Sequence, residues 1–209
     1  MIKKIKRKIY LLLVPFLKIS KYFGWQYYLR TAKEIKIVVG AGKTKYKGWF
    51  NTDIDTLDVT NEGDFIKYFY NKKIKNILAE HVLEHLNYDE LNLMTMNFFK
   101  YSDRDINIRI AVPDGFHSDV NYINKVKPGG SGEGAHDHKH LFNYKTLSEL
   151  FEKRGFNAEL IEYWDEAGNF HTRYKNDDNG YITRSFINDE RNKNGNPNYT
   201  SLIIDFSKE

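Results

Sequence analysis

The chain has 209 residues, which is enough for one domain with a substantial core, and it shows no internal repeat. It contains no cysteine, and this excludes a disulfide framework and thiolate chemistry. The net charge of +4 hides an asymmetry, because residues 1–50 hold 13 Lys and Arg against one acid, whereas the remaining residues hold 19 bases and 27 acids.

The basic first part of the chain, residues 1–30, is predicted to form an amphipathic helical segment. Its apolar run from Ile9 to Leu17 contains Pro15, precedes no small-residue cleavage site and is far shorter than the roughly 20 residues that span a bilayer. Two interpretations stay open: the helix packs on the domain, or it lies in the plane of an anionic membrane. The side chains that would then enter the lipid are Leu11, Leu12, Phe16 and Trp25.

The same segment bears on location and partners. We expect a cytoplasmic protein, with peripheral contact at the inner face of the cytoplasmic membrane as the open alternative. We expect no nucleic-acid partner, because the bases cluster at one end without a recognisable RNA- or DNA-reading module.

An apolar run that ends in small residues marks the first predicted strand, Ile35–Val39. The turn Gly40-Ala41-Gly42 follows at once, so the backbone there can approach a ligand with no side chain between them. The next predicted strand, Phe50–Ile54, carries Asp53 near its end, where a carboxylate can accept hydrogen bonds from the two hydroxyls of a ribose. Together they predict an adenosine-containing ligand at the carboxyl edge of a parallel sheet.

Strands and helices alternate along the rest of the chain. Capping boxes at Asn87–Glu90 and Thr146–Glu149 predict two helix starts, and Asp64–Tyr70 is expected to form a shorter helix. The further predicted strands are Ile74–Ala79, Ile106–Val112, Phe156–Ile161 and Ser201–Phe206. This alternation predicts an α/β fold, a Rossmann-like, doubly wound and mostly parallel sheet of about seven strands with helices on both faces.

Two connections are too long for plain turns, and they cover residues 113–144 and 163–200. Long structureless loops in a compact domain are usually functional or partly disordered. Both follow predicted strands, which places at least the first on the edge where ligands bind. We expect both to act as lids on the substrate side of a domain that spans residues 31–209.

Seven short motifs, in order, resemble the class I S-adenosylmethionine-dependent methyltransferases. The likeness is greatest to a small bacterial group of predicted methyltransferases associated with surface-polysaccharide synthesis, and it covers roughly residues 35–206. The motifs are VVGAG at 38–42, GWFNTDID at 48–55, LDVT at 57–60, AEHVLEHL at 79–86, RIAVPDG at 109–115, PGGSGEGAHDHKHLFNY at 128–144 and RGF at 154–156. Lys43 and Thr44 stand where the family has a third glycine, and this departure weakens a pyrophosphate cradle. The downstream motifs EHVLEHL and AVPDG are the ones that favour S-adenosylmethionine.

The resemblance implies S-adenosylmethionine as cofactor and gives roles to matching residues. The backbone of Gly40, Ala41 and Gly42 would line its methionine part, and Asp53 would bind the ribose, with Asp55 as the alternative. Asp58 in LDVT would meet the adenine amino group. Glu80 and His81 would leave their strand beside the reactive methyl.

The segment His136-Asp137-His138 leaves three interpretations open: a general base or substrate contact, a divalent-ion site, or a plain polar loop. We take the first and place His136, Asp137, His138 and His117 at the catalytic site. Asp114 beside His117, and His171 from the second lid, are further candidates. We expect no metal ligands in EHVLEHL, because His81 lies at a strand end and a zinc-protease motif needs both histidines in one helix.

The expected reaction is O-methylation of a sugar or glycan precursor of a bacterial surface polysaccharide. The lid residues that would suit a sugar, by stacking or hydrogen bonding, are Tyr122, Trp164, Tyr174 and Asn143. Two alternatives stay open: a methyltransferase for another acceptor, such as a lipid, a protein or a small metabolite, and a catalytically silent cofactor-binding subunit of a glycan-synthesis complex.

Overall fold

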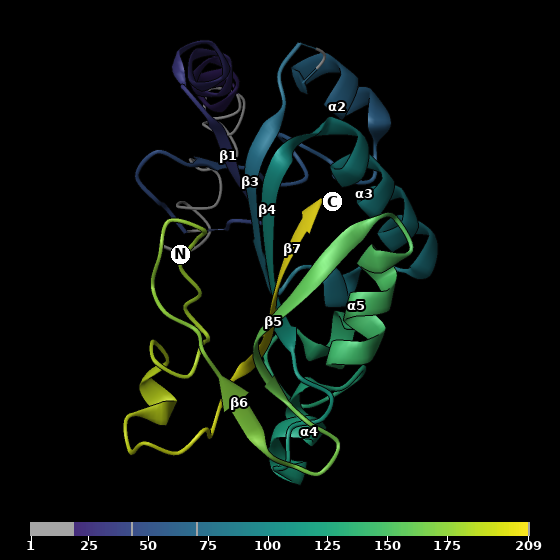
Figure 1. Cartoon of the computed structure of the whole chain (residues 1–209), viewed down its shortest axis with the longest axis vertical. Helices are drawn as coiled ribbons and strands as arrows, with labels where there is room; N and C mark the ends of the chain where they lie inside the picture. Colours follow the sequence, from purple (N-terminus) through teal and green to yellow (C-terminus); the bar gives the residue numbers. More distant parts are fainter. Residues whose placement is uncertain (1–18, 43, 70, 209) are drawn as a thin grey trace, which may run out of the picture.

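The computed structural model describes residues 19–42, 44–69 and 71–208. Within these residues seven strands form one sheet in the order β2-β1-β3-β4-β7-β5-β6 (Figure 1). The strands are β1 Ile35–Val39, β2 Phe50–Asn51, β3 Ile74–Glu80, β4 Ser102–Pro113, β5 Phe156–Trp164, β6 Phe170–Thr172 and β7 Ser201–Lys208.

Five of the described strands run in one direction. Strands β2, β1, β3 and β4 pair in parallel. Strands β4 and β5 each pair antiparallel with β7, so they point the same way, while β6 pairs antiparallel with β5. The predicted α/β class, with a mostly parallel sheet of seven strands, is therefore confirmed.

The helices connect these strands. Residues 19–31 are helical. The following α-helices are α2 Glu62–Phe69, α3 Tyr88–Tyr101, α4 Val120–Val126 and α5 Tyr144–Glu152, and the 3-10 turns are η1 Leu83–His85, η2 Ala135–Asp137 and η3 Glu190–Asn192. The capping box at Asn87 is confirmed, since its side chain accepts from the Glu90 N–H while Glu90 accepts from the Asn87 N–H.

The second predicted capping box is wrong by three residues. Helix α5 is capped by Asn143, whose side chain accepts from the N–H groups of Lys145 and Thr146, so Thr146 is the third helical residue and not the cap. The sequence patterns also miss α4 and β6, which lie in the two long connections and are too short for a periodic signal.

The two faces of the sheet are covered differently. Alternate strand residues such as Ile37 and Ile77 join the apolar side chains of α2, α3 and α5 in the main core. Their neighbours, such as Leu78, face the other way and pack with Tyr174 and Ile182 from the segment 173–200. Figure 1 shows α2, α3 and α5 on one side of the sheet and this segment on the other. The expectation of helices on both faces is corrected here, because an irregular segment covers the second face.

The helix over residues 19–31 packs on the domain through one side. Trp25 is fully buried, with its ring 4.5 Å from that of Phe50 and 6.0 Å from that of Tyr28. It therefore cannot be one of the side chains that enter a membrane, and Leu11, Leu12 and Phe16 lie outside the described residues. No helix in the described part of the chain is both long and apolar enough to span a bilayer.

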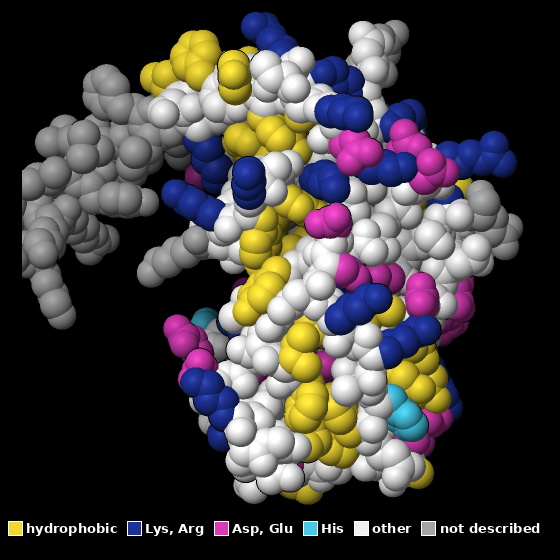
Figure 2. All heavy atoms as spheres, turned by 60° about the vertical axis from the view of Figure 1, so that its left-hand side comes forward, with side chains coloured by type: hydrophobic (Ala, Val, Ile, Leu, Met, Phe, Trp, Pro, Cys, Tyr) yellow, Lys and Arg dark blue, Asp and Glu magenta, His cyan; other side chains and the backbone are white. Residues whose placement is uncertain are grey.

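The outer side of this helix is apolar. Ile19, Phe23 and Tyr27 recur at every fourth residue and are exposed. Figure 2, which brings the left-hand side of Figure 1 forward, shows hydrophobic side chains beside Lys and Arg on the upper part of that face. Packing on the domain, one of the two interpretations for this region, thus holds for the buried side of residues 19–31.

Candidate functional site

The carboxyl ends of β1 and β3 form the point where the strand order reverses. From β1 the chain goes first to β2 on one side and then to β3 on the other. Ligands of open α/β sheets bind in the crevice at such a point. Two adjoining cavities of about 990 and 280 Å³ lie here, and both are lined by Val39, Gly40, His81 and His85.

The turn after β1 needs its glycines for different reasons. Gly40 and Gly42 both have a left-handed backbone, with φ of +57° and +52°. A Cβ at Gly40 would also lie 2.6 Å from Cγ2 of Val82, whereas one at Gly42 would meet nothing within 4 Å. Gly40, Ala41 and Gly42 all line the larger cavity, as the sequence predicts for a close approach of backbone to ligand.

The two predicted aspartates line the smaller cavity. Asp53 follows the short strand β2, and no hydrogen bond or ion pair is found for its carboxylate within the described chain, so its oxygens can accept from a ligand. Asp58 also lines this cavity, but its Oδ1 already accepts from the N–H and the hydroxyl of Thr60. Asp55, the alternative to Asp53, does not line either cavity.

Glu80 ends β3 and holds down the segment 173–200. Its two carboxylate oxygens accept from the backbone N–H groups of Thr183 and Arg184, at 3.1 and 2.8 Å. The structure thus places Glu80 in the lining of the larger cavity, with its side chain already occupied by the second long connection.

His81 follows with a strained backbone. Its φ of 55° is positive, which is uncommon outside glycine, and among the described non-glycine residues it is the one case. Its Nε2 lies 3.0 Å from the Ser201 hydroxyl, and its Nδ1 lies 3.3 Å from Oε1 of Glu84. Such strain persists where the surroundings fix it and is concentrated at functional sites.

A cluster of Glu84, His85 and His138 lies in the larger cavity. Glu84 is fully buried, and neither carboxylate oxygen has a hydrogen bond. Burial acts to raise the pKa of Glu84, but the imidazoles of His81 and His85 outweigh it and the pKa is lowered. The group is therefore a carboxylate at neutral pH.

The side chains of His136, Asp137 and His138 point in different directions. His138 points into the cavity, and its Nδ1 lies 2.6 Å from the backbone oxygen of Val126 at the end of α4. Asp137 is exposed and its Oδ2 lies 3.3 Å from Nδ1 of His85. His136 is exposed and does not line either cavity. Only one of the two histidines is thus placed to meet a ligand in the larger cavity.

His117 and Asp114 lie outside both cavities. The ring of His117 stacks on Tyr122 at 3.9 Å, and burial lowers its pKa to about 4. Asp114 is fully buried and accepts from the N–H groups of Phe116 and Trp164, and burial raises its pKa to about 6. Both residues thus tie the start of the first long connection to its neighbours.

The aromatic residues expected to stack on a sugar are mostly structural. Tyr122 and Trp164 are buried and bond to Thr200, and Tyr174 packs under the second face of the sheet. Asn143 is the cap of α5. The aromatic side chains that do line the larger cavity are Tyr46 and Tyr199.

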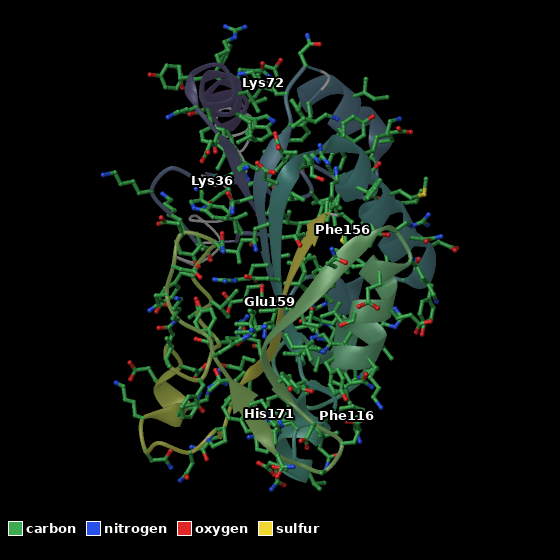
Figure 3. All side chains as sticks on the ribbon, in the orientation of Figure 1. Lys36, Lys72, Phe116, Phe156, Glu159 and His171 are labelled. Atoms are coloured by element: carbon green, nitrogen blue, oxygen red, sulfur yellow. The ribbon has the colours of Figure 1, made fainter. Side chains whose placement is uncertain are left out.

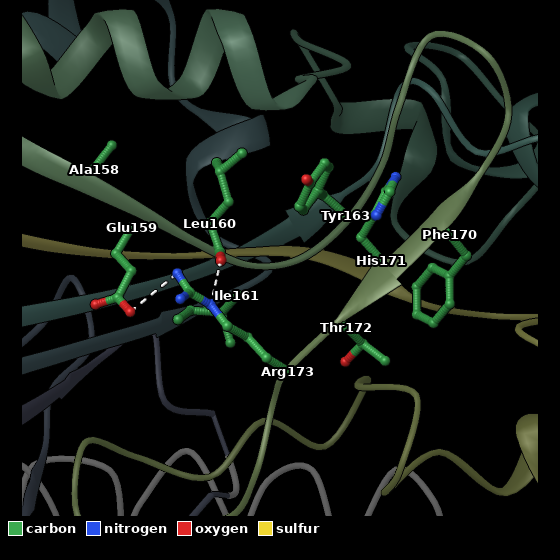
Figure 4. Close-up of a pocket in the computed structure, with 9 residues that line it drawn as sticks. All are labelled: Ala158, Glu159, Leu160, Ile161, Tyr163, Phe170, His171, Thr172 and Arg173. Atoms are coloured by element: carbon green, nitrogen blue, oxygen red, sulfur yellow. Dashed lines mark hydrogen bonds and ion pairs between the residues drawn. The ribbon is translucent and has the colours of Figure 1, made fainter.

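His171 belongs to a different hollow, beside the β5–β6 hairpin (Figures 3 and 4). Its Nε2 lies 2.8 Å from Oδ2 of Asp165, and its ring stacks on Tyr163. In the same hollow Arg173 donates to the Leu160 carbonyl and pairs with Glu159, as the dashed lines in Figure 4 show. His171 is therefore separate from the two adjoining cavities.

Several cavity-lining residues escaped the sequence reasoning. Glu84 and His85 are two of them, because the EHVLEHL motif predicts site roles only for Glu80 and His81 at the strand end. Lys125, Arg191 and Tyr199 come from the long connections, where no spacing rule indicates which side chains turn inward.

The chain is similar in structure to several solved proteins. A SAM-dependent methyltransferase from Archaeoglobus fulgidus is 15% identical with a TM-score of 0.46, over 95% of this chain and 97% of that one. Magnesium protoporphyrin IX methyltransferase (ChlM) from Synechocystis PCC 6803, with bound SAH, is 9% identical with a TM-score of 0.43, over 92% and 83%. LepI in complex with SAM is 11% identical with a TM-score of 0.41, over 88% of this chain and 46% of that one.

No family model and no curated protein sequence matches the chain. The structural likenesses have TM-scores below 0.5 and carry no inference about activity or ligand. The fold assignment rests on the strand order and directions given above. None of these neighbours links the chain to polysaccharide synthesis.

Proposed function

We propose that the chain is an S-adenosylmethionine-dependent methyltransferase. The observation that carries this proposal is the pair of adjoining cavities at the switch point. One is lined by the Gly40–Gly42 turn and the other by Asp53, whose carboxylate has no hydrogen bond or ion pair among the described residues. The turn would lie against the methionine part of the cofactor, and Asp53 would accept from the ribose hydroxyls.

Two features favour this cofactor over a dinucleotide. A pyrophosphate is usually bound at a helix N-terminus directly after the glycine turn, whereas the described residues between β1 and β2 form no helix. The cavity lining also includes the carboxylates Glu80, Glu84, Asp53 and Asp58, which attract the sulfonium and ammonium charges of S-adenosylmethionine and repel phosphate.

We propose a hydroxyl of a sugar or glycan precursor, such as one used for a bacterial surface polysaccharide, as the acceptor. Tyr46 and Tyr199 line the larger cavity, and the Arg191 guanidinium lies 3.2 Å from the centre of the Tyr199 ring. Lys125 in the same lining offers donors for sugar oxygens. In the reaction the acceptor oxygen forms a bond to the methyl carbon, the carbon–sulfur bond breaks to leave a neutral thioether, and the hydroxyl gives up its proton. We propose that His138 assists, because it lines this cavity and no hydrogen bond of its Nε2 is found among the described residues.

The acceptor is tested by incubating the protein with methyl-labelled S-adenosylmethionine and panels of nucleotide sugars, glycans, lipids, proteins and small metabolites. We expect label in an alkali-stable ether on a sugar, and loss of at least about 100-fold in rate with His138→Ala at unchanged cofactor affinity. Label found only on a lipid, a protein or another metabolite would show that the acceptor is not a sugar. Cofactor binding without any methyl transfer would favour a catalytically silent cofactor-binding subunit.

We also propose that the N-terminal segment contacts an anionic membrane, with the remainder of the protein in the cytoplasm. The supporting features are the exposed stripe of Ile19, Phe23 and Tyr27 and the excess of bases in residues 1–50. Co-sedimentation with vesicles of phosphatidylcholine and phosphatidylserine should fall with Phe23→Ser and with added salt. Equal sedimentation with vesicles of phosphatidylcholine alone would count against it.

A further inference from the structure

Two segments far apart in the sequence bring three metal-binding side chains together. Glu84 and His85 lie in η1, which follows β3 after two intervening residues, and His138 follows η2. The backbone fixes this meeting, since the N–H groups of Lys139 and His140 both donate to the Glu84 carbonyl, at 2.7 and 3.3 Å. One ligand atom from each of the three side chains lies within 4.8 Å of the other two.

Three polar atoms of this cluster lack a hydrogen bond in the described part of the chain, and one of them, Nδ1 of His85, lies 3.3 Å from Oδ2 of Asp137. Glu84 has no exposed surface, and both of its carboxylate oxygens and Nδ1 of His85 are buried without a hydrogen bond within the described chain. The nearest imidazole nitrogens, at 3.3 Å from His81 and 3.9 Å from His138, do not satisfy hydrogen-bond geometry to Glu84. A buried polar group without a hydrogen bond is destabilising, so the cluster is costly unless a ligand fills it.

The orientation of His138 points to the nature of that ligand. A carbonyl oxygen only accepts hydrogen bonds, so the contact of 2.6 Å to Val126 places the hydrogen of His138 on Nδ1. Its Nε2 then carries a free lone pair and lies 3.9 Å from Oε1 of Glu84. An imidazole whose second nitrogen donates to a backbone carbonyl is the usual arrangement of a metal-binding histidine.

We propose that Glu84, His85 and His138 bind one divalent transition-metal ion, of the kind represented by Zn²⁺, Mn²⁺ or Co²⁺. One carboxylate and two imidazoles suit these ions better than Mg²⁺ or Ca²⁺, which prefer oxygen ligands. Ligand atoms bonded to one ion at about 2.1 Å lie roughly 3–4 Å apart, so small side-chain rotations close the site from its present spacing. Three protein ligands leave coordination positions open towards the cavity, as in catalytic sites.

A role of the ion in methyl transfer rests on the proposed function, whereas binding of the ion to the three side chains does not. In an open position the ion would bind an acceptor hydroxyl and lower its pKa, so that the proton passes to solvent as the oxygen attacks the methyl carbon. The loss of rate expected for His138→Ala would then come from the lost ion. A measurement of metal binding without cofactor or acceptor separates the two proposals.

The test uses the full chain after dialysis against EDTA. Titration with CoCl₂ is followed by visible absorption, and titration with ZnCl₂ by calorimetry. We expect one ion per chain, a Co²⁺ spectrum that requires nitrogen ligands, and an affinity at least about 100-fold weaker in His138→Ala and in Glu84→Gln. His136→Ala is the matched control, because this exposed histidine of the same loop lies outside the cluster and should leave both titrations unchanged.

The absence of saturable binding of either ion to the wild-type chain would overturn the proposal, as would equal affinity in wild type and His138→Ala. Circular dichroism checks the fold of each variant, and if Glu84→Gln does not fold, His85→Ala takes its place. Binding of S-adenosylhomocysteine is measured on the same samples. Metal binding without cofactor binding would support the ion site and contradict the proposed function. Cofactor binding without metal binding would support the proposed function and overturn the ion site.

Discussion

Gly40 is the residue on which the turn after β1 depends, for two separable reasons. Its φ of +57° costs a residue with a Cβ about 1–2 kcal/mol, and the Cβ would also overlap Val82. Gly42 shares the backbone conformation but has open space around it. The motif in the sequence predicted a close backbone approach, and the neighbour across from Gly40 became visible only in the structure.

Gly40→Ala should therefore destabilise the protein more than Gly42→Ala, which serves as the control. Thermal unfolding of both variants measures the difference. Val82→Ala should remove the excess cost in the Gly40→Ala background, because it deletes the methyl groups that the new Cβ would meet. Equal destabilisation by both glycine variants, or no rescue, would show that the contact with Val82 does not matter.

The candidate site was predictable from the sequence where residues follow directly from strand ends. Asp53 and Gly40 are fixed by β1 and β2, and the structure places both in the adjoining cavities. The sequence does not separate His136 from His138, because no pattern in the loop predicts the 3-10 turn over Ala135–Asp137, and of the two only His138 lines the cavity. His117 has the right residue type, but α4 and Tyr122 bury it.

At the scale of elements, the segment 173–200 takes the place that helices hold in a doubly wound sheet. Arg109 of β4 anchors it, because the guanidinium donates to Asp177 and Gly180 of the segment and also to Asp205 of β7. Glu80 holds the same segment through the N–H groups of Thr183 and Arg184. The segment 173–200 is thus held on the sheet by hydrogen bonds and ion pairs as well as by apolar contacts. Such an attachment leaves no periodic pattern in the sequence.

Asp177→Asn should loosen this segment without unfolding the sheet, because Arg109 keeps its two contacts with Asp205. We expect faster hydrogen exchange at the amides of Thr183 and Arg184, and little change in β3 and β4. Asp178→Asn is the control, since no contact of its side chain is found among the described residues. Unchanged exchange at Thr183 and Arg184 would mean that the pair of Arg109 with Asp177 does not anchor the segment.

At the scale of the molecule, a buried acid couples stability to pH. Glu162 of β5 is fully buried and accepts from the N–H of Phe186 and the hydroxyl of Thr172. Burial raises its pKa from 4.5 to about 8, and Asp114 nearby adds to the rise. Between pH 4.5 and pH 8 the Glu162 carboxyl therefore holds a proton in the folded state that it has lost in the unfolded state. The contribution of Glu162 to the free energy of unfolding is greatest below pH 4.5 and falls as the pH rises towards 8.

Glu162→Gln should flatten this dependence, because the neutral amide has no proton to lose. Chemical unfolding between pH 5 and pH 8 should show the wild type losing up to about 1.4 kcal/mol per pH unit from this group, and the variant losing less. Asp178→Asn is the comparison, because this exposed carboxylate has no contact among the described residues. If Glu162→Gln has the same pH slope as wild type, the carboxyl is not protonated in the folded protein.

The proposed function depends above all on the claim that the switch-point cavities bind S-adenosylmethionine through the Gly40–Gly42 turn and Asp53. Calorimetry with S-adenosylhomocysteine tests it most directly, with Asp53→Ala set against Asp55→Ala. The claim predicts one binding site on the wild-type chain, at least about 100-fold weaker binding in Asp53→Ala from the loss of charge-assisted hydrogen bonds, and near wild-type binding in Asp55→Ala. No binding to the wild type, or full affinity in Asp53→Ala, would contradict it.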